Sequence, residues 1–149
     1  YLEAHKLGEA DKKTLQKLFK ILHLDTYKEY ICNQNAWYGY NKEAIRFSYK
    51  FIEEAGKLSN LIGHKEIRKA VEQLVQKIEE LNHLAGLKMY SEPTDDYSYQ
   101  LPKRTEREYE QSKIDAESIN QKSKEVARLL DALVLNLKEE HEMEIYAHK

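Results

Sequence analysis

A stripe of apolar and small side chains runs along the C-terminal part of the chain at alternating steps of three and four residues. Side chains at this spacing share one face of an α-helix. The stripe predicts one long helix over about residues 103–140. Its members are Tyr109, Ser112, Ala116, Ile119, Ser123, Val126, Leu130, Leu133 and Leu137. We expect its aliphatic second half to lie in the core, and its small-residue first half to allow close helix approach or to project outward.

The same periodicity predicts four earlier helices, over about residues 11–23, 26–32, 42–55 and 65–85. Asp25 and Asn41 are candidate N-caps of the second and third helices, and Gly56 and Gly86 are candidate ends of the third and fourth. The predicted inward positions of the first helix are Leu15, Leu18, Phe19 and Leu22. Those of the second helix are Tyr27, Tyr30 and Ile31. Those of the fourth helix are Ile67, Val71, Leu74, Ile78, Leu81 and Ala85.

Two segments break the helical pattern. Residues 33–41 form an aromatic loop, and residues 87–102 are the longest stretch without periodicity, which is long enough to fold back and let the flanking helices pair. We therefore predict an all-α fold. It is a four- to five-helix bundle with two long antiparallel C-terminal helices, and residues 1–149 form a single domain excised from a longer protein.

Net charge and cysteine content limit the classes of partner that we expect and indicate the cellular compartment. The net charge is −2, whereas nucleic-acid binding usually shows a basic excess, so we expect no nucleic-acid partner. Cys32 is the single cysteine, which excludes an intrachain disulfide and favours a cytoplasmic location. The sequence contains no apolar run of about 18 residues, so we expect no membrane insertion of this segment.

Motifs that carry chemistry are weak in this sequence. Glu80 and His83 form one Glu-x-x-His pair, whereas a di-metal bundle site needs two such pairs. Cys32 has His23 nine residues upstream as a candidate base, but a lone cysteine beside apolar residues is typically a small core residue. No nucleophile elbow or glycine-rich phosphate loop occurs. We expect no catalytic residue, no metal and no cofactor.

The aromatic loop is the candidate binding site. Trp37, Tyr38 and Tyr40 are large amphipathic side chains of the kind that dominate interface energetics, and Tyr97 and Tyr99 are expected to lie nearby. For Trp37 we favour the alternative that it fills the core where the second and third helices meet. We expect Tyr38 and Tyr40 to face a partner.

Ser112 and Ser123 extend this candidate surface onto the first half of the last helix. Small residues there could contact a partner or pair two copies of the chain. A homodimer is therefore one of the expected assemblies.

The order of these features resembles a loosely defined group of uncharacterised bacterial all-helical modules, which often follow a coiled-coil or membrane-anchoring segment. The resemblance covers residues 15–22, 35–41, 51–52, 67–81, 101–102 and 109–137. It implies a cytosolic appendage of a larger protein. It carries over no binding or catalytic residue.

Three functions remain open from the sequence. The first is a non-catalytic protein-interaction or sensor module of a bacterial cytosolic protein. The second is a small-molecule-binding or enzymatic bundle with a pocket lined by tyrosines and a histidine, which a cavity of at least ~300 Å³ would favour. The third is a self-association module that uses the small-residue stripe.

Overall fold

The computed structural model describes residues 6–91, 94–95 and 97–145, and this part of the chain is predominantly helical. The α-helices are α1 (Glu9–Leu22), α2 (Leu24–Tyr27), α3 (Lys42–Ala55), α4 (Lys65–Lys88) and α5 (Glu106–His141), and the strands are β1 (Tyr40–Asn41), β2 (Tyr90–Ser91) and β3 (Ser98–Gln100). A π-helical turn (Lys28–Cys32) follows α2, and 3-10 turns occupy Ala36–Tyr38 and Leu58–Asn60. The predicted helical class and the long C-terminal helix are confirmed.

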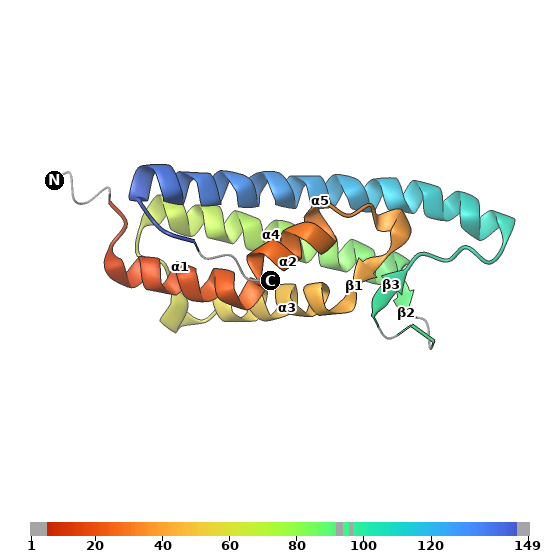
Figure 1. Cartoon of the computed structure of the whole chain (residues 1–149), viewed down its shortest axis with the longest axis horizontal. Coiled ribbons are helices and arrows are strands. Elements are labelled where there is room, and N and C mark those ends of the chain that lie inside the picture. Colours follow the sequence, from red (N-terminus) through yellow and green to blue (C-terminus); the bar gives the residue numbers. More distant parts are fainter. Residues whose placement is uncertain (1–5, 92–93, 96, 146–149) are drawn as a thin grey trace.

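Helix α5 runs along one side of the molecule (Figure 1). Its N-terminus is closed by a capping box, in which the Thr105 hydroxyl accepts from the Glu108 backbone N–H and the Glu108 carboxylate accepts from Thr105. Every member of the predicted stripe is buried except Tyr109, which is 41% exposed. The three-four spacing therefore identified the face of α5 that packs against the rest of the chain.

Helix α4 lies beside α5, and ion pairs join the two helices at several levels. Lys77 pairs with Glu125 at 3.4 Å, Lys122 with Glu80 at 3.3 Å, and Lys88 with Asp115 at 3.6 Å. The apolar stripe predicted for α4 is buried throughout. The pairs of Lys77 and Lys122 are half-exposed and add little stability, because surface pairs contribute only about 0–1 kcal/mol, so the apolar contacts hold the helices together.

Two helix ends differ from the predictions. Helix α4 passes Gly86 and ends at Lys88, because a glycine inside a helix costs only about 1 kcal/mol and the buried Met89 continues the apolar face. Asp25 is not the cap of α2. His23 takes that place with a left-handed φ of 54°, which separates α1 from α2.

The π-helical turn changes which side chains of the second helical segment point inward. Its Asn33 N–H bonds to the Lys28 carbonyl, five residues back, so each residue in the turn is rotated from its α-helical position. Tyr27 and Ile31 are buried as predicted, but Tyr30 is 43% exposed and Cys32 is buried in its place. A local change of helical period is not visible in a pattern of apolar residues.

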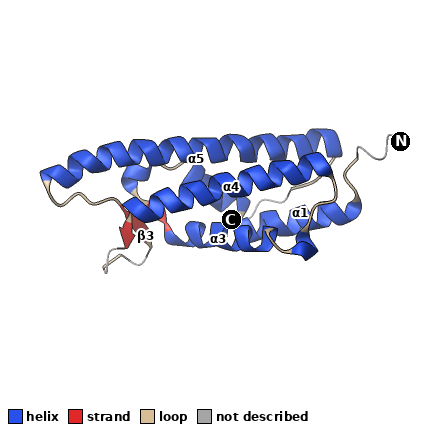
Figure 2. Cartoon of the chain, turned by 180° about the vertical axis from the view of Figure 1, so that it is seen from behind, coloured by secondary structure: helices blue, strands red, loops and turns tan. Residues whose placement is uncertain are grey.

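Helices α1 and α3 pack against each other and lie along the side of the molecule opposite α5, where α3 also contacts α4 (Figure 2). The predicted inward face of α1 is buried, and Asn41 caps α3 by accepting from the Ala44 N–H at 3.0 Å, as predicted. At one end of the molecule, β1, β3 and β2 form a small antiparallel sheet in that order, with Tyr40 opposite Tyr99. This sheet corrects the prediction of an irregular segment over residues 87–102. Strands of two or three residues are too short to show alternation.

The other end of the molecule is closed by contacts between the start and the end of the described chain. The Leu7 backbone N–H donates to Nδ1 of His141 at 3.2 Å, and the His141 ring meets the edge of the His64 ring at 5.1 Å between centres. Leu7 and Met143 are both buried. Among the described residues, no helix combines the length and apolar character needed to cross a membrane.

The buried stripe of α5 should dominate the stability of the fold. Replacing the fully buried Leu130 with alanine removes core contacts and leaves a cavity, so we expect a loss of about 2–5 kcal/mol in the free energy of unfolding. Leu135 lies on the same helix and is 55% exposed, so Leu135→Ala should change it by no more than about 0.5 kcal/mol. Urea unfolding followed by circular dichroism measures both. Equal losses would contradict the assignment of the buried face.

His141 should make stability depend on pH. Burial, and after it the neighbouring His64, lower the pKa of His141 below its ordinary value of 6.5. The unfolded chain then binds a proton at His141 more readily than the folded chain does. The contribution of neutral His141 to the free energy of unfolding is therefore complete above pH 6.5, and it is lost as the pH falls through the lowered pKa of the folded state. Between pH 7.5 and pH 5.5, the free energy of unfolding measured with urea should therefore fall more for the wild type than for His141→Asn. The Asn Oδ1 can still accept the hydrogen bond from the Leu7 N–H, but it does not titrate. Identical losses would rule out His141 as the cause.

Candidate functional site

The sheet end of the molecule gathers most of the aromatic residues that the sequence singled out. The turn Ala36–Tyr38 precedes β1, and its cap is Asn35, whose Oδ1 accepts from the Trp37 N–H at 3.0 Å. Asn120 of α5 fixes this turn, because its Oδ1 accepts from the Ala36 N–H at 2.8 Å and its Nδ2 donates to Asn35 Oδ1 at 2.9 Å. The aromatic loop is thus hydrogen-bonded to the long helix.

Gly39 allows the loop to enter the sheet. Its φ of 89° is a conformation that residues with a side chain rarely adopt. A Cβ built at this position would lie 2.8 Å from the Tyr99 carbonyl oxygen and 2.4 Å from Gln100 Nε2. The close approach of two backbones here requires glycine.

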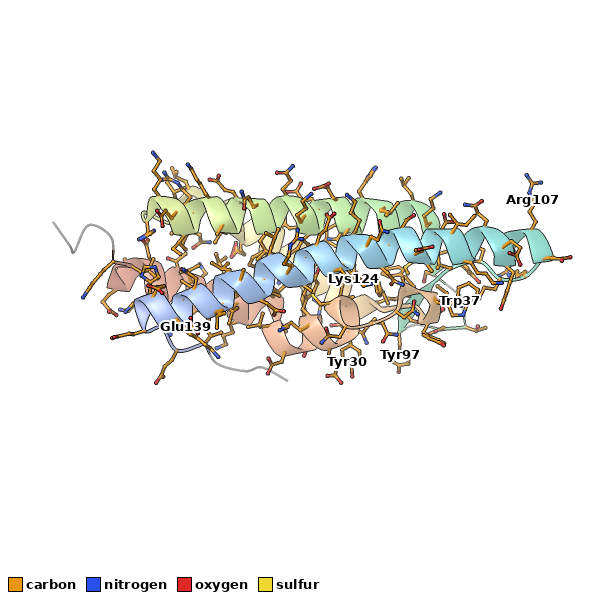
Figure 3. The ribbon with its side chains drawn as sticks, turned by 90° about the horizontal axis from the view of Figure 1, so that it is seen from above. Tyr30, Trp37, Tyr97, Arg107, Lys124 and Glu139 are labelled. Atoms are coloured by element: carbon orange, nitrogen blue, oxygen red, sulfur yellow. The ribbon has the colours of Figure 1, made fainter. Side chains whose placement is uncertain are left out.

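Trp37 is half-buried and packs against the outside of the core, so it fills the core only in part. The fully buried Ala36 takes the core position. The ammonium of Lys103 lies 4.2 Å from the centre of the indole ring, and the edge of Tyr109 packs against the same ring at 5.1 Å. Burial lowers the pKa of Lys103, which also donates to the Trp37 carbonyl. Trp37 therefore joins the loop to the start of α5, at the edge seen in Figure 3.

Tyr40 is fully buried, so the prediction that it faces a partner is wrong. Strand β1 contacts β3, α3 and the π-helical turn, and these elements enclose the ring. Burial raises the pKa of Tyr40 to about 12, the Ser123 hydroxyl acts in the opposite direction, and Cys32 adds to the rise. The phenol stays protonated at neutral pH and packs in the core beside α5.

Ser112 and Ser123 are also buried, which corrects the prediction of an exposed small-residue face. The Ser112 hydroxyl donates to the Pro102 carbonyl at 2.5 Å, and the Ser123 hydroxyl donates to the Asn120 carbonyl at 2.9 Å. The sequence predicts that the small-residue half of the stripe either allows close approach within the chain or projects outward, and the structure shows close packing within the chain. The small side chains leave room for the 33–41 loop.

Tyr38 and Tyr97 are the most exposed of the described aromatic side chains at this end, with 70% and 79% of their surface exposed, against 54% for Tyr49 and 41% for Tyr109. Their backbones are held by the sheet, since Gln100 Nε2 donates to the Tyr38 carbonyl at 3.4 Å and the Lys42 N–H donates to the Tyr97 carbonyl at 2.8 Å. Tyr99 is half-buried, with the Lys42 ammonium 5.5 Å from its ring centre. Figure 3 shows Tyr97 and Trp37 on the same edge of the molecule as Tyr30.

A cavity of about 180 Å³ lies between the sheet, α3 and α4. It is smaller than the ~300 Å³ of an ordinary ligand pocket. Four tyrosines contribute to its wall, and no histidine does. Its lining residues are Tyr40, Ile45, Tyr49, Asn82, Ala85, Gly86, Met89, Tyr90, Ser91 and Tyr99. We call this cavity the tyrosine pocket.

Asn82 is the polar group at the buried side of the tyrosine pocket, and only 4% of it is exposed. Ser48 donates its hydroxyl hydrogen to the Ile45 carbonyl at 2.6 Å, and Asn82 Nδ2 donates to the Ser48 oxygen at 3.0 Å. This chain of bonds fixes the amide orientation, and Asn82 Oδ1 has no hydrogen-bond partner among the described residues. An available sequence signal was overlooked here: Asn82 is a polar residue between the stripe positions Ile78 and Ala85.

The groups considered for nucleophilic catalysis do not form a site. Burial raises the pKa of Cys32 to about 12, against a smaller opposing effect of Lys28, so its thiol stays protonated and unreactive. The His23 ring stacks on Phe47 with 3.8 Å between centres. Cys32 therefore serves as a small core residue.

The Glu80 and His83 pair does not form a metal site either. Glu80 binds Lys122 and Lys77 across the surface of α4 and α5, and His83 is exposed. Within the part of the chain that the structure describes, no three His, Cys, Asp or Glu side chains are gathered as metal ligands.

Comparison with known proteins gives no further guide to the site. No model of a protein family, no curated protein and no solved structure matches this chain. The geometry of the sheet end therefore carries the functional argument.

Gly39 should be the most sensitive glycine of this site. Gly39→Ala should lower the free energy of unfolding by about 1–3 kcal/mol, because the added Cβ meets the Tyr99 carbonyl and φ must stay positive. Gly56→Ala is the matched control, since its φ is −79° and its added Cβ makes only ordinary contacts of 3.5 Å and longer. Urea unfolding monitored by Trp37 fluorescence compares them. A Gly39→Ala protein as stable as Gly56→Ala would contradict the close approach.

Proposed function

We propose that the chain is a non-catalytic protein-interaction or sensor module of a bacterial cytosolic protein, and that it binds a protein partner through the sheet end. The observation that carries the proposal is the pair of solvent-facing tyrosines, Tyr38 and Tyr97, on hydrogen-bonded backbone. Tyrosine is enriched at interface hot spots because it buries a large area with few rotatable bonds. A backbone that is already ordered also lowers the entropy lost on binding.

The rest of the fold would act as a rigid support for this surface. In the ion pairs Lys77–Glu125, Lys122–Glu80 and Lys88–Asp115, residue numbers rise along α4 as they fall along α5. This order is the one that an antiparallel pair of helices produces. We propose a four- to five-helix bundle built on that pair, which presents the sheet at one end.

The alternative of self-association has lost the surface on which it was based. The stripe of small residues that would pair two copies is covered by the chain itself at Ser112, Ala116 and Ser123. A homodimer would have to use another face. The alternative of a small-molecule-binding bundle is supported by the tyrosine pocket.

Partner binding is tested by removing the two exposed rings. Tyr38→Ser combined with Tyr97→Ser should abolish co-purification of the partner from an extract of the source cells, measured by quantitative mass spectrometry against the wild type. The folded state should persist, because both side chains are more than two-thirds exposed.

The matched control removes an equal number of exposed apolar side chains elsewhere. Leu58 and Leu135 are 85% and 55% exposed, and Leu58→Ser with Leu135→Ser should retain the partner. If the tyrosine double variant recovers the same proteins as the wild type, the sheet end is not the interaction surface.

A further inference from the structure

The tyrosine pocket has an uncharged wall, and two of its lining residues, Asn82 and Tyr40, each bury a polar atom that has no hydrogen-bond partner among the described residues. Its lining residues include no Asp, Glu, Lys, Arg or His. Asn82 Oδ1 is shielded from solvent and unpaired among the described residues, although buried polar atoms are nearly always hydrogen-bonded. A pocket of this kind favours an apolar molecule that supplies one hydrogen-bond donor.

Gly86 lines the tyrosine pocket and is itself exposed to solvent. It lies inside α4, four residues after Asn82 and thus on the same face, where glycine is a poor helix former. A Cβ built on Gly86 would meet no atom within 4 Å, so packing does not require glycine at this position. A larger side chain would extend across space that the pocket now occupies. The glycine is explained by the opening that it leaves.

The charges around the pocket decide between ligand classes. The Lys42 ammonium lies 5.5 Å from the centre of the Tyr99 ring, and the Arg104 guanidinium lies 5.6 Å from that of Tyr90. These cations oppose a cationic ligand, although tyrosine rings alone would attract one. A carboxylate would place its oxygens against Asn82 Oδ1, which is itself an acceptor. A neutral molecule avoids both conflicts.

We propose that the tyrosine pocket binds a small, uncharged, planar molecule that donates one N–H or O–H hydrogen bond to Asn82 Oδ1. A cavity of about 150 Å³ in another protein accepts benzene, so the 180 Å³ here suits a ring with on the order of six to nine non-hydrogen atoms. The tyrosines and Met89 contact the faces of the ring, and Ser48 holds the Asn82 amide in the orientation that leaves Oδ1 as the acceptor. This proposal does not rest on the protein-interaction function.

Phenol and toluene test the proposal, because they have equal numbers of non-hydrogen atoms and only phenol has a donor. Each is titrated into the ¹⁵N-labelled chain, with the backbone amides of Asn82, Gly86 and Tyr90 as reporters in NMR spectra. We expect phenol to bind with a dissociation constant of about 0.1–1 mM, and toluene at least about tenfold more weakly, as loss of one buried hydrogen bond implies. Tetramethylammonium should not shift these amides.

Two variants locate the binding. Gly86→Leu should abolish the phenol response while the helix is preserved, because its side chain enters open space and leucine is the better helix former. Leu87→Ala changes the neighbouring residue, which does not line the pocket, and should keep wild-type affinity for phenol. Asn82→Leu should bring the affinities for phenol and toluene within about twofold of each other, since it removes the acceptor at similar volume.

Several results would overturn the proposal. Equal affinity of the wild type for phenol and toluene would remove the role of Asn82. Stronger binding of tetramethylammonium than of phenol would identify a cation cage. A phenol affinity unchanged by Gly86→Leu would place binding elsewhere. Dissociation constants above about 20 mM for every probe would leave only a recess for water. The co-purification experiment with Tyr38→Ser and Tyr97→Ser tests the protein-interaction function. Neither of its outcomes changes the results expected for phenol and toluene.

Discussion

Burial of one face of α5 is the constraint on which the rest of the structure depends. Helix α5 packs against α4 along its length and also meets the π-helical turn and the 36–38 turn. An isolated helix gains little stability in water, so a helix of 36 residues with a charged outer face needs this apolar contact to persist. Helices α1 and α3 then complete the core from the side of the molecule opposite α5, as Figure 2 shows.

The change of side-chain size along the stripe determines where the candidate site forms. Towards the C-terminus, Val126, Leu130 and Leu137 fill the space between helices with aliphatic side chains. Towards the N-terminus, Ser123 is small enough to admit the large side chain of Tyr40, and Asn120 hydrogen-bonds the turn that precedes it. The aromatic loop therefore lies over the small half of the stripe, and the sheet forms where this loop meets β3.

Helical periodicity was sufficient to predict the helices and their buried faces, because an apolar stripe records the packing of each helix directly. It did not predict the sheet or the rotation within the π-helical turn, because both are set by contacts between distant segments and span few residues. The same limit applies to the site. Tyr38 and Tyr40 are two residues apart with similar side chains, yet one is 70% exposed and the other fully buried. Tyr38 ends the turn before Gly39 and Tyr40 begins β1, and the pairing of β1 with β3 joins segments that are distant in the sequence.

The sheet end also carries features that lower stability. Within the described residues, Tyr40 and Asn82 each bury a neutral polar atom without a hydrogen bond, and burial raises the pKa of Tyr40 to about 12. The backbone at Gly39 has a positive φ, and Gly86 places a residue without a side chain inside helix α4. Natural sequences concentrate such locally unfavourable choices at functional sites, because elsewhere replacement by a better-packed residue costs nothing. The choices at Tyr40, Asn82, Gly39 and Gly86 lie together around the tyrosine pocket and the loop beside it, whereas the aliphatic half of α5 keeps an unbroken buried stripe. This contrast within one molecule is the physical reason to look for function at the sheet end.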